Sequence, residues 1–75
     1  MTTNAERLLT QALKMVKLDG NFVPAVVGKK IGLSPGDSEL AARALANAGL
    51  LVLGFDYDAQ FTREFRKARA VKSAV

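Results

Sequence analysis

The chain has 75 residues, with 11 Lys or Arg, 7 Asp or Glu, and no Cys, His or Trp. This length fits one small domain with a modest hydrophobic core. Without Cys and His, disulfides, thiolate chemistry and Ser–His or Cys–His catalytic arrangements are excluded, so we expect a non-catalytic protein without cofactor or bound metal. The longest apolar run, residues 48–55, is too short to span a bilayer, and no signal-peptide pattern is present. We therefore expect a cytoplasmic protein with no membrane partner.

Positive charge is concentrated towards both ends of the chain. Residues 1–34 carry five basic and two acidic groups, residues 35–54 one and two, and residues 55–75 five and three. The resulting net charge of +4 favours a polyanionic partner such as nucleic acid, although a well-solvated surface explains the same excess.

Three helices are predicted in the first two thirds of the chain. The first is capped by Thr3, ends at residues 19–21 with Gly20 in a positive-φ conformation, and has an apolar stripe of Leu8, Leu9, Ala12, Leu13 and Val16. Residues 22–23 are extended before Pro24, and a second helix spans about residues 24–31 and ends at Gly32. The third helix has Ser34 as its cap and Pro35 in its first position, and continues through Ala48 to a stop at Gly49.

The last third of the chain allows more than one assignment of secondary structure. Residues 50–55 (LLVLGF) indicate a short buried strand, and residues 56–58 a turn. Residues 59–72 fit either a returning strand, by alternation, or a helix capped by Asp58 with Phe61, Phe65 and Ala68 on one face; we prefer the helix. The pair Asp56 and Asp58 is better explained by the turn than by a cation site.

The segment VGKKIGLSP (residues 27–35), followed after a helix by GLLV (residues 49–52), resembles the winged helix-turn-helix superfamily over residues 4–55. The resemblance implies a mainly α fold with a minimal β component: a three-helix core, here followed by a C-terminal basic segment at residues 59–75 in one domain. It further implies double-stranded DNA as partner, in transcription regulation or DNA maintenance. The third helix would be the recognition helix, which lies in the major groove and presents its N-terminal residues to base edges.

Positions matching that family pattern give the candidate DNA-binding residues. On the third helix these are Ser34, near a phosphate, and the outward residues Gly36, Asp37, Glu39, Leu40 and Arg43. Phosphate contacts are expected from the cations Lys14, Lys29, Lys30, Arg63, Arg66, Lys67, Arg69 and Lys72. Residue 38 is normally apolar and buried in this family, but here it is Ser.

Alternative interpretations of the same residues are structural. Lys29 and Lys30 suit a solvated helix end, Arg43 can pair with Glu39 one turn earlier, and Asp37 completes the Ser34 capping box. The acidic and apolar outer face also fits a protein-interaction module without DNA binding. The face of Phe61, Phe65 and Ala68 is expected to pack on the core. If it is exposed instead, Phe61 and Phe65 are the best candidates for a homodimer contact.

Overall fold

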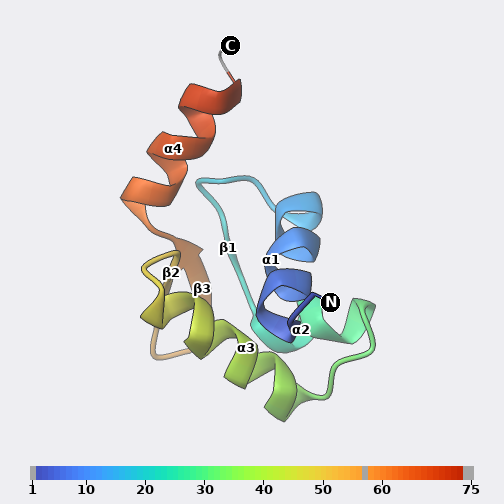
Figure 1. Cartoon of the computed structure of the whole chain (residues 1–75). Helices are drawn as coiled ribbons and strands as arrows, with labels where there is room; N and C mark the ends of the chain where they lie inside the picture. Colours follow the sequence, from blue (N-terminus) through green and yellow to red (C-terminus); the bar gives the residue numbers. More distant parts are fainter. Residues whose placement is uncertain (1, 57, 74–75) are drawn as a thin grey trace.

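The computed structural model describes residues 2–56 and 58–73, with the side chains of 71–73 left out. Within these ranges the chain forms helices α1 (Asn4–Met15), α2 (Pro24–Lys30), α3 (Pro35–Asn47) and α4 (Arg63–Ser73), and strands β1 (Asn21–Phe22), β2 (Leu51–Leu53) and β3 (Ala59–Phe61). The fold is therefore mainly helical with a small antiparallel sheet, as expected. Helices α1, α2 and α3 pack together beside the sheet, and α4 projects from it (Figure 1).

Local signals place the starts of α1 and α3 as predicted. The Thr3 hydroxyl accepts a hydrogen bond from the Glu6 N–H at 3.1 Å, and the Ser34 hydroxyl accepts one from the Asp37 N–H at 3.1 Å. Each bond satisfies a backbone donor that the first helical turn leaves unpaired.

Two glycines end helices as the sequence indicates. Gly32 and Gly49 adopt φ of 81° and 82°, the left-handed region that glycine reaches without a Cβ clash. The chain then turns back: the Leu33 N–H donates to the Gly28 carbonyl, and the Leu50 N–H donates to the Leu45 carbonyl, both at 2.9 Å. Helices α2 and α3 are therefore separate rods joined by a short corner.

The end of α1 was predicted too late. The helix stops at Met15, and Val16 is already extended with φ −130° and ψ 155°. Gly20 is not among the positive-φ glycines of the described chain and instead closes a turn by donating to the Lys17 carbonyl at 2.9 Å. Val16 and Leu18 pack against the core from this irregular segment, so tertiary contacts outweigh the helical pattern.

The sheet has the order β1-β3-β2, with β3 antiparallel to both neighbours. Gln60 of the central strand β3 pairs with Asn21 of β1 on one side and with Val52 of β2 on the other. The strand predicted at residues 50–55 is shorter and only partly buried, because one face of the sheet packs on the helices while the other is open. Leu51 is 3% exposed, Val52 is 58% exposed, and Phe55 beyond the strand is completely exposed.

Both interpretations of residues 59–72 hold for part of the segment. The first three residues form β3, and the rest belongs to α4, whose cap is Thr62 and not Asp58. The Thr62 hydroxyl accepts from the Phe65 N–H at 3.2 Å and donates to the Gly49 carbonyl at 2.8 Å, so it fixes the start of α4 to the end of α3.

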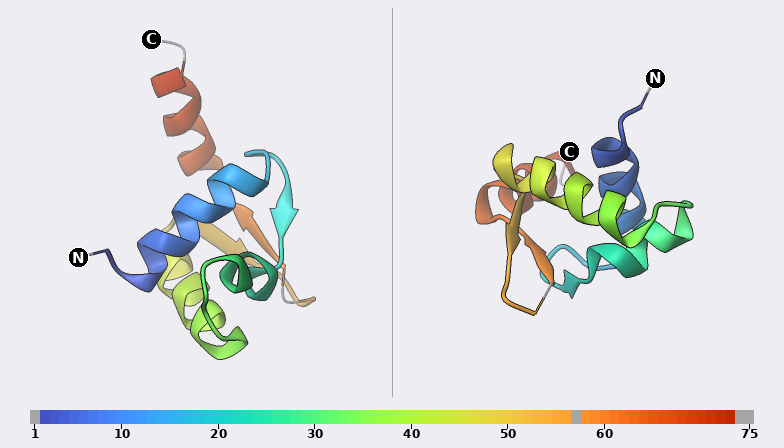
Figure 2. Two further views of the ribbon diagram at one scale, coloured as in Figure 1. Left: turned by 90° about the vertical axis from the view of Figure 1, so that its right-hand side faces the viewer. Right: turned by 90° about the horizontal axis from the view of Figure 1, so that it is seen from below.

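The core lies between the helices and the inner face of the sheet. It consists of Leu8, Ala12, Phe22, Val27, Ala41, Ala42, Leu45, Leu51, Ala59 and Phe61. Three aromatic rings extend it towards α4: Phe61 lies 5.6 Å from Phe22 and 5.4 Å from the half-buried Phe65, between ring centroids. Beyond Phe65, α4 leads away from the body of the molecule (Figure 2).

Candidate nucleic-acid interface

The corner between α2 and α3 is built on a close approach of two small residues. Gly28 and Ser38 are both buried, and a Cβ placed on Gly28 would lie 2.7 Å from the Cβ of Ser38. The Ser38 hydroxyl donates to the Ser34 carbonyl at 2.8 Å, so the buried polar group is satisfied within its own helix. Glycine at residue 28 and serine at residue 38 therefore fix how closely the two helices pack.

Arg7 connects α1 to the same corner. One of its guanidinium nitrogens donates to the carbonyl of Ile31 at 2.7 Å, at the end of α2 where helix carbonyls lack intrahelical partners. Sequence analysis missed this role, since the partner is a backbone atom 24 residues away. A cation near a helix C-terminus also interacts favourably with the helix dipole.

The lysines predicted to bind phosphate on α1 and α2 are exposed to solvent. Lys29 and Lys30 occupy the last turn of α2, and both are exposed. Lys14, in the last turn of α1, is exposed too, and it lines a shallow hollow together with Arg7 and Ile31. Lys29 and Lys30 thus lie beside the entry to α3, whereas Lys14 lies two helical turns along α1 from Arg7.

The outer face of α3 is uncovered by any other element of the described chain. Its exposed residues include all the predicted contacts: Ser34, Gly36, Asp37, Glu39, Leu40 and Arg43. Arg43 forms an ion pair with Glu39 at 2.9 Å, as the spacing of four residues suggested. The one cation of this face is therefore partly neutralised by its neighbour, and Leu40 is left 67% exposed.

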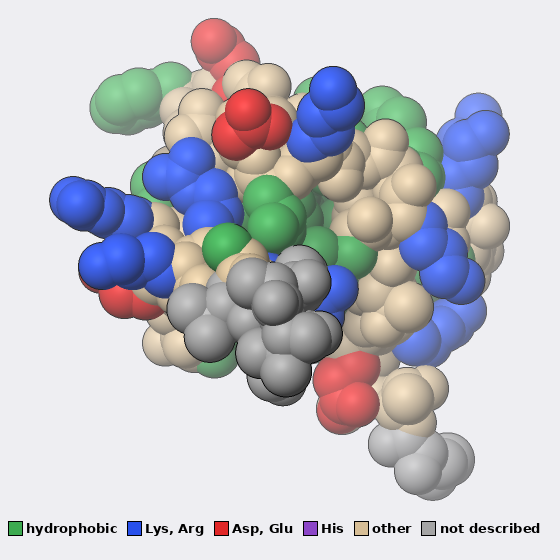
Figure 3. Space-filling model, turned by 90° about the horizontal axis from the view of Figure 1, so that it is seen from above, with side chains coloured by type: hydrophobic (Ala, Val, Ile, Leu, Met, Phe, Trp, Pro, Cys, Tyr) green, Lys and Arg blue, Asp and Glu red, His purple; other side chains and the backbone are tan. Residues whose placement is uncertain are grey.

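The basic residues of α4 form a second group, separate from the corner. Arg63, Arg66, Lys67 and Arg69 are exposed on the projecting helix, and the side chain of Lys72 lies outside the described residues. Seen from above, several cationic side chains lie on the left and several on the right of the molecule (Figure 3). The structure does not bring all the predicted phosphate contacts onto one continuous surface.

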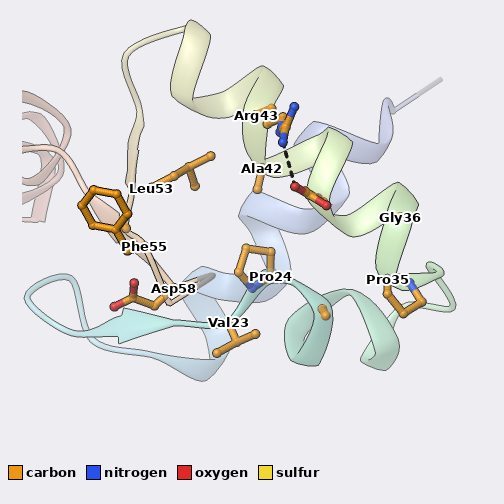
Figure 4. Close-up of a pocket in the computed structure, with 12 residues that line it drawn as sticks. Val23, Pro24, Pro35, Gly36, Ala42, Arg43, Leu53, Phe55 and Asp58 are labelled. Atoms are coloured by element: carbon orange, nitrogen blue, oxygen red, sulfur yellow. Dashed lines mark hydrogen bonds and ion pairs between the residues drawn. The ribbon is translucent and has the colours of Figure 1, made fainter.

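A groove of about 590 Å³ opens between α3, the start of α2 and the β2–β3 hairpin. Its walls are largely apolar, with Val23 and Pro24 on one side and Leu53 and Phe55 on another (Figure 4). The Glu39–Arg43 ion pair lies along the α3 wall, and Asp58 projects from the hairpin.

Two acidic residues and one basic residue line this groove. They are Glu39, Asp58 and Arg43, and Glu39 is paired with Arg43. The Asp58 carboxylate is therefore the acidic lining group that has no cationic partner among the residues lining the groove. The sequence identified the acids on the third helix. It could not show that Glu39 and the hairpin residue Asp58 line the same groove, because that depends on the tertiary fold.

The turn interpretation of Asp56 and Asp58 is supported by hydrogen bonds. The Asp58 carbonyl accepts from the Gly54 N–H at 2.9 Å, and the Asp58 carboxylate accepts from the Asn21 side-chain amide at 3.1 Å. Among residues 2–56 and 58–73, no cluster of three or more metal-ligating side chains occurs. Tyr57, between the two acids, is outside the described residues.

The expected packing of Phe61 on the core is confirmed, so Phe61 does not meet the condition set for a dimer contact. This side chain is 3% exposed, because it belongs to the inner face of β3 and packs in the core. Phe65 is half-buried against it, and Ala68, the third residue of the predicted apolar face, is exposed on α4.

Comparison with protein-family models, curated proteins and solved structures finds no significant match to the chain. None of the described helices has the length and apolar character needed to cross a membrane. The geometry of the α2–α3 corner, the outer face of α3 and the groove is therefore the basis for a functional proposal.

Proposed function

We propose that this is a non-catalytic DNA-binding domain of the winged helix-turn-helix type, acting in transcription regulation or DNA maintenance in the cytoplasm. The observation that carries the proposal is the corner itself: a capped helix with an uncovered outer face, α3, follows a sharp turn flanked by exposed lysines. The order of helices and strands, with a β2–β3 hairpin beside α3, supports the winged form of this fold.

In the proposed complex, phosphate contacts supply most of the affinity. Lys29, Lys30 and Lys14 would neutralise backbone phosphates at the corner, and the first turn of α3 offers its N-terminal backbone to another phosphate. The α4 cations Arg66, Lys67 and Arg69 would reach a different stretch of backbone, because they lie apart from the corner.

Base readout would be limited in this complex. Arg43 is held by Glu39, and the acidic side chains Asp37 and Glu39 are repelled by nearby phosphates, although either can accept a hydrogen bond from cytosine N4. The protein should therefore bind many sequences with similar affinity.

The proposal is tested by titrating the protein with a mixed-sequence duplex at several salt concentrations while following backbone amide shifts. We expect shifts at Lys29, Lys30 and residues 34–43, and an affinity that falls steeply as salt rises. Replacing Lys29 and Lys30 with Ala should weaken binding to all duplexes alike and lower the log–log salt slope by about 2, roughly one per lost phosphate contact.

Lys17→Ala is the matched control, because Lys17 is an exposed lysine in the connection between α1 and β1, outside the proposed contacts. It should change the affinity much less than the corner variants. An absence of amide shifts at low salt would remove the DNA-binding proposal. A change of sequence preference in the double lysine variant would show that those lysines read bases instead of phosphates.

A second candidate function is favoured by one specific observation, the largely apolar groove lined by Glu39 and Asp58. Exposed Phe55 and half-exposed Leu53 offer a hydrophobic surface that a DNA backbone would not use, and a protein partner would bury it. In that case the domain is a protein-interaction module, and α3 contacts a protein instead of a DNA groove.

A further inference from the structure

The groove and α4 have complementary properties within the same chain. The groove is largely apolar and is lined by the carboxylates of Glu39 and Asp58, whereas α4 exposes Arg63, Arg66, Lys67 and Arg69 with the single exposed acid Glu64. We propose that α4 of one copy of this protein docks into the α3–hairpin groove of a second copy. This self-association goes beyond the proposed DNA binding and does not depend on it.

Among the described side chains of α4, Phe65 is the one that packs on the body of its own chain. The other described side chains of α4 are exposed, and the extensive helix packing of the molecule joins α1, α2 and α3. The helix has 11 residues, and isolated helices shorter than about 12–15 residues are marginally stable in water. A surface that receives α4 would stabilise it.

The residues that line the groove favour an occupant that is both apolar and positively charged. Phe55 is completely exposed on its rim, and large exposed aromatic groups commonly mark contact sites. The carboxylates of Glu39 and Asp58 add a preference for positive charge, with only Arg43 opposing it. On α4 the exposed Ala68 and Ala70 lie beside the exposed Arg66 and Arg69, so the helix offers small apolar groups and positive charge together.

Helix α4 does not reach the α3–hairpin groove of its own chain. The Thr62 N–H donates to the Leu50 carbonyl at 3.1 Å, and its hydroxyl donates to the Gly49 carbonyl, so the start of α4 is fixed beside the end of α3. From that point α4 runs away from the body, whereas the hairpin turn that borders the groove lies at the opposite end of β3 (Figure 1). The helix therefore reaches a groove of another copy and not its own.

The contact is heterologous, because each copy contributes a different surface to it. Every molecule then has one helix to insert and one groove to fill, so copies associate head to tail into rings or chains. Association should weaken as salt rises, since the complementary charges lie near the surface.

The experiment is sedimentation velocity over a wide concentration range with two variants. Phe55→Ser with Glu39→Lys alters the groove and leaves α4 intact; Arg66→Glu with Arg69→Glu reverses charges on α4 and leaves the groove intact. Each variant alone should self-associate at least about tenfold more weakly than the wild type, as expected when a central aromatic or charged contact is lost.

Mixing the two variants gives the decisive result. The groove variant still has an intact α4 and the α4 variant still has an intact groove, so the mixture should form a one-to-one complex that grows no further. Val26→Ser and Lys17→Glu are the matched controls, because they change an exposed apolar residue and an exposed cation outside both surfaces. Circular dichroism should show that all variants are folded.

Three results would overturn the proposal: a wild type that stays monomeric at every concentration, groove variants that associate as tightly as the wild type, or a mixture that forms no complex. The second result would place the contact elsewhere, for example around Phe65. Salt-dependent binding of duplex DNA by the corner lysines is measured separately, so failure of either proposal is recognised independently of the other.

Discussion

The corner between α2 and α3 and the helix α4 differ in how the rest of the chain holds them. The corner is held from three sides: by the Gly28–Ser38 approach, by the Ser34 cap and by the Arg7 bond to the Ile31 carbonyl. By contrast, α4 is attached at its first turn through Thr62 and Phe65, and its remaining described side chains face solvent.

Regular helices in one small domain therefore need not have the same local stability. The position of α3 is determined by several non-local contacts, so a change at the corner must be felt throughout the body. Helix α4 has few such contacts, so it can open or bind a partner while the body stays folded. The corner is therefore suited to present a binding surface of fixed shape, and α4 is suited to a contact that requires adjustment.

The largest effect is expected from Gly28→Ala. A methyl group at this residue would overlap the side chain of Ser38, and the two helices would have to separate. We expect the free energy of unfolding to fall by about 2–3 kcal/mol, the usual cost of overpacking a well-filled core. Urea denaturation followed by circular dichroism measures it.

Gly36→Ala is the matched control for this change. Gly36 is exposed in the first turn of α3, and a Cβ built there meets nothing within 4 Å. Alanine should therefore stabilise the protein, by up to about 1 kcal/mol, because it favours helix over glycine. If Gly28→Ala were as well tolerated, close packing of α2 on α3 would not define the corner.

A smaller effect is expected from Ser34→Ala. The substitution removes the acceptor for the Asp37 N–H and should lower the free energy of unfolding by about 1 kcal/mol. Thermal or urea unfolding measures the loss, and Ser34→Asp, which keeps a capping oxygen, should restore most of it. A loss that Asp fails to restore would mean that the Ser34 side chain acts by something other than capping.

The features predicted well from the sequence are those set by a few neighbouring residues. Thr3, Ser34, Gly32 and Gly49 begin or end helices as expected, because a cap or a left-handed glycine depends on local backbone chemistry. The Glu39–Arg43 pair was predictable for the same reason, since residues four apart meet on one helix face.

The features that failed depend on contacts between distant segments. The apolar stripe that ended at Val16 could not reveal that α1 stops at Met15, because Val16 also packs well from an irregular connection. The division of residues 59–72 into β3 and α4 is set by pairing with β1 and β2, which a single segment does not encode.

The candidate site was predictable only in part for the same reason. The sequence identified the exposed lysines and the acidic third helix, but not that Phe55 projects from a hairpin beside it. Nor could it identify Arg7, whose partner is a backbone carbonyl, an acceptor that every residue carries.

One pair of equivalent substitutions measures how firmly α3 and α4 are held. Ala44 in α3 and Ala68 in α4 are both exposed and lie within their helices, so Gly at either residue removes the same helix-favouring side chain. Ala44→Gly should lower the free energy of unfolding by about 1 kcal/mol, because α3 unfolds together with the body. Ala68→Gly should change it by less than about 0.5 kcal/mol, since α4 opens by itself before the body does. Amide hydrogen exchange, measured at concentrations where the protein is monomeric, should be faster throughout α4 in the Ala68→Gly variant and unchanged in α1, α2 and α3. Equal losses of stability for the two variants would mean that α4 is held as firmly as α3, which would remove one argument for its docking on another copy.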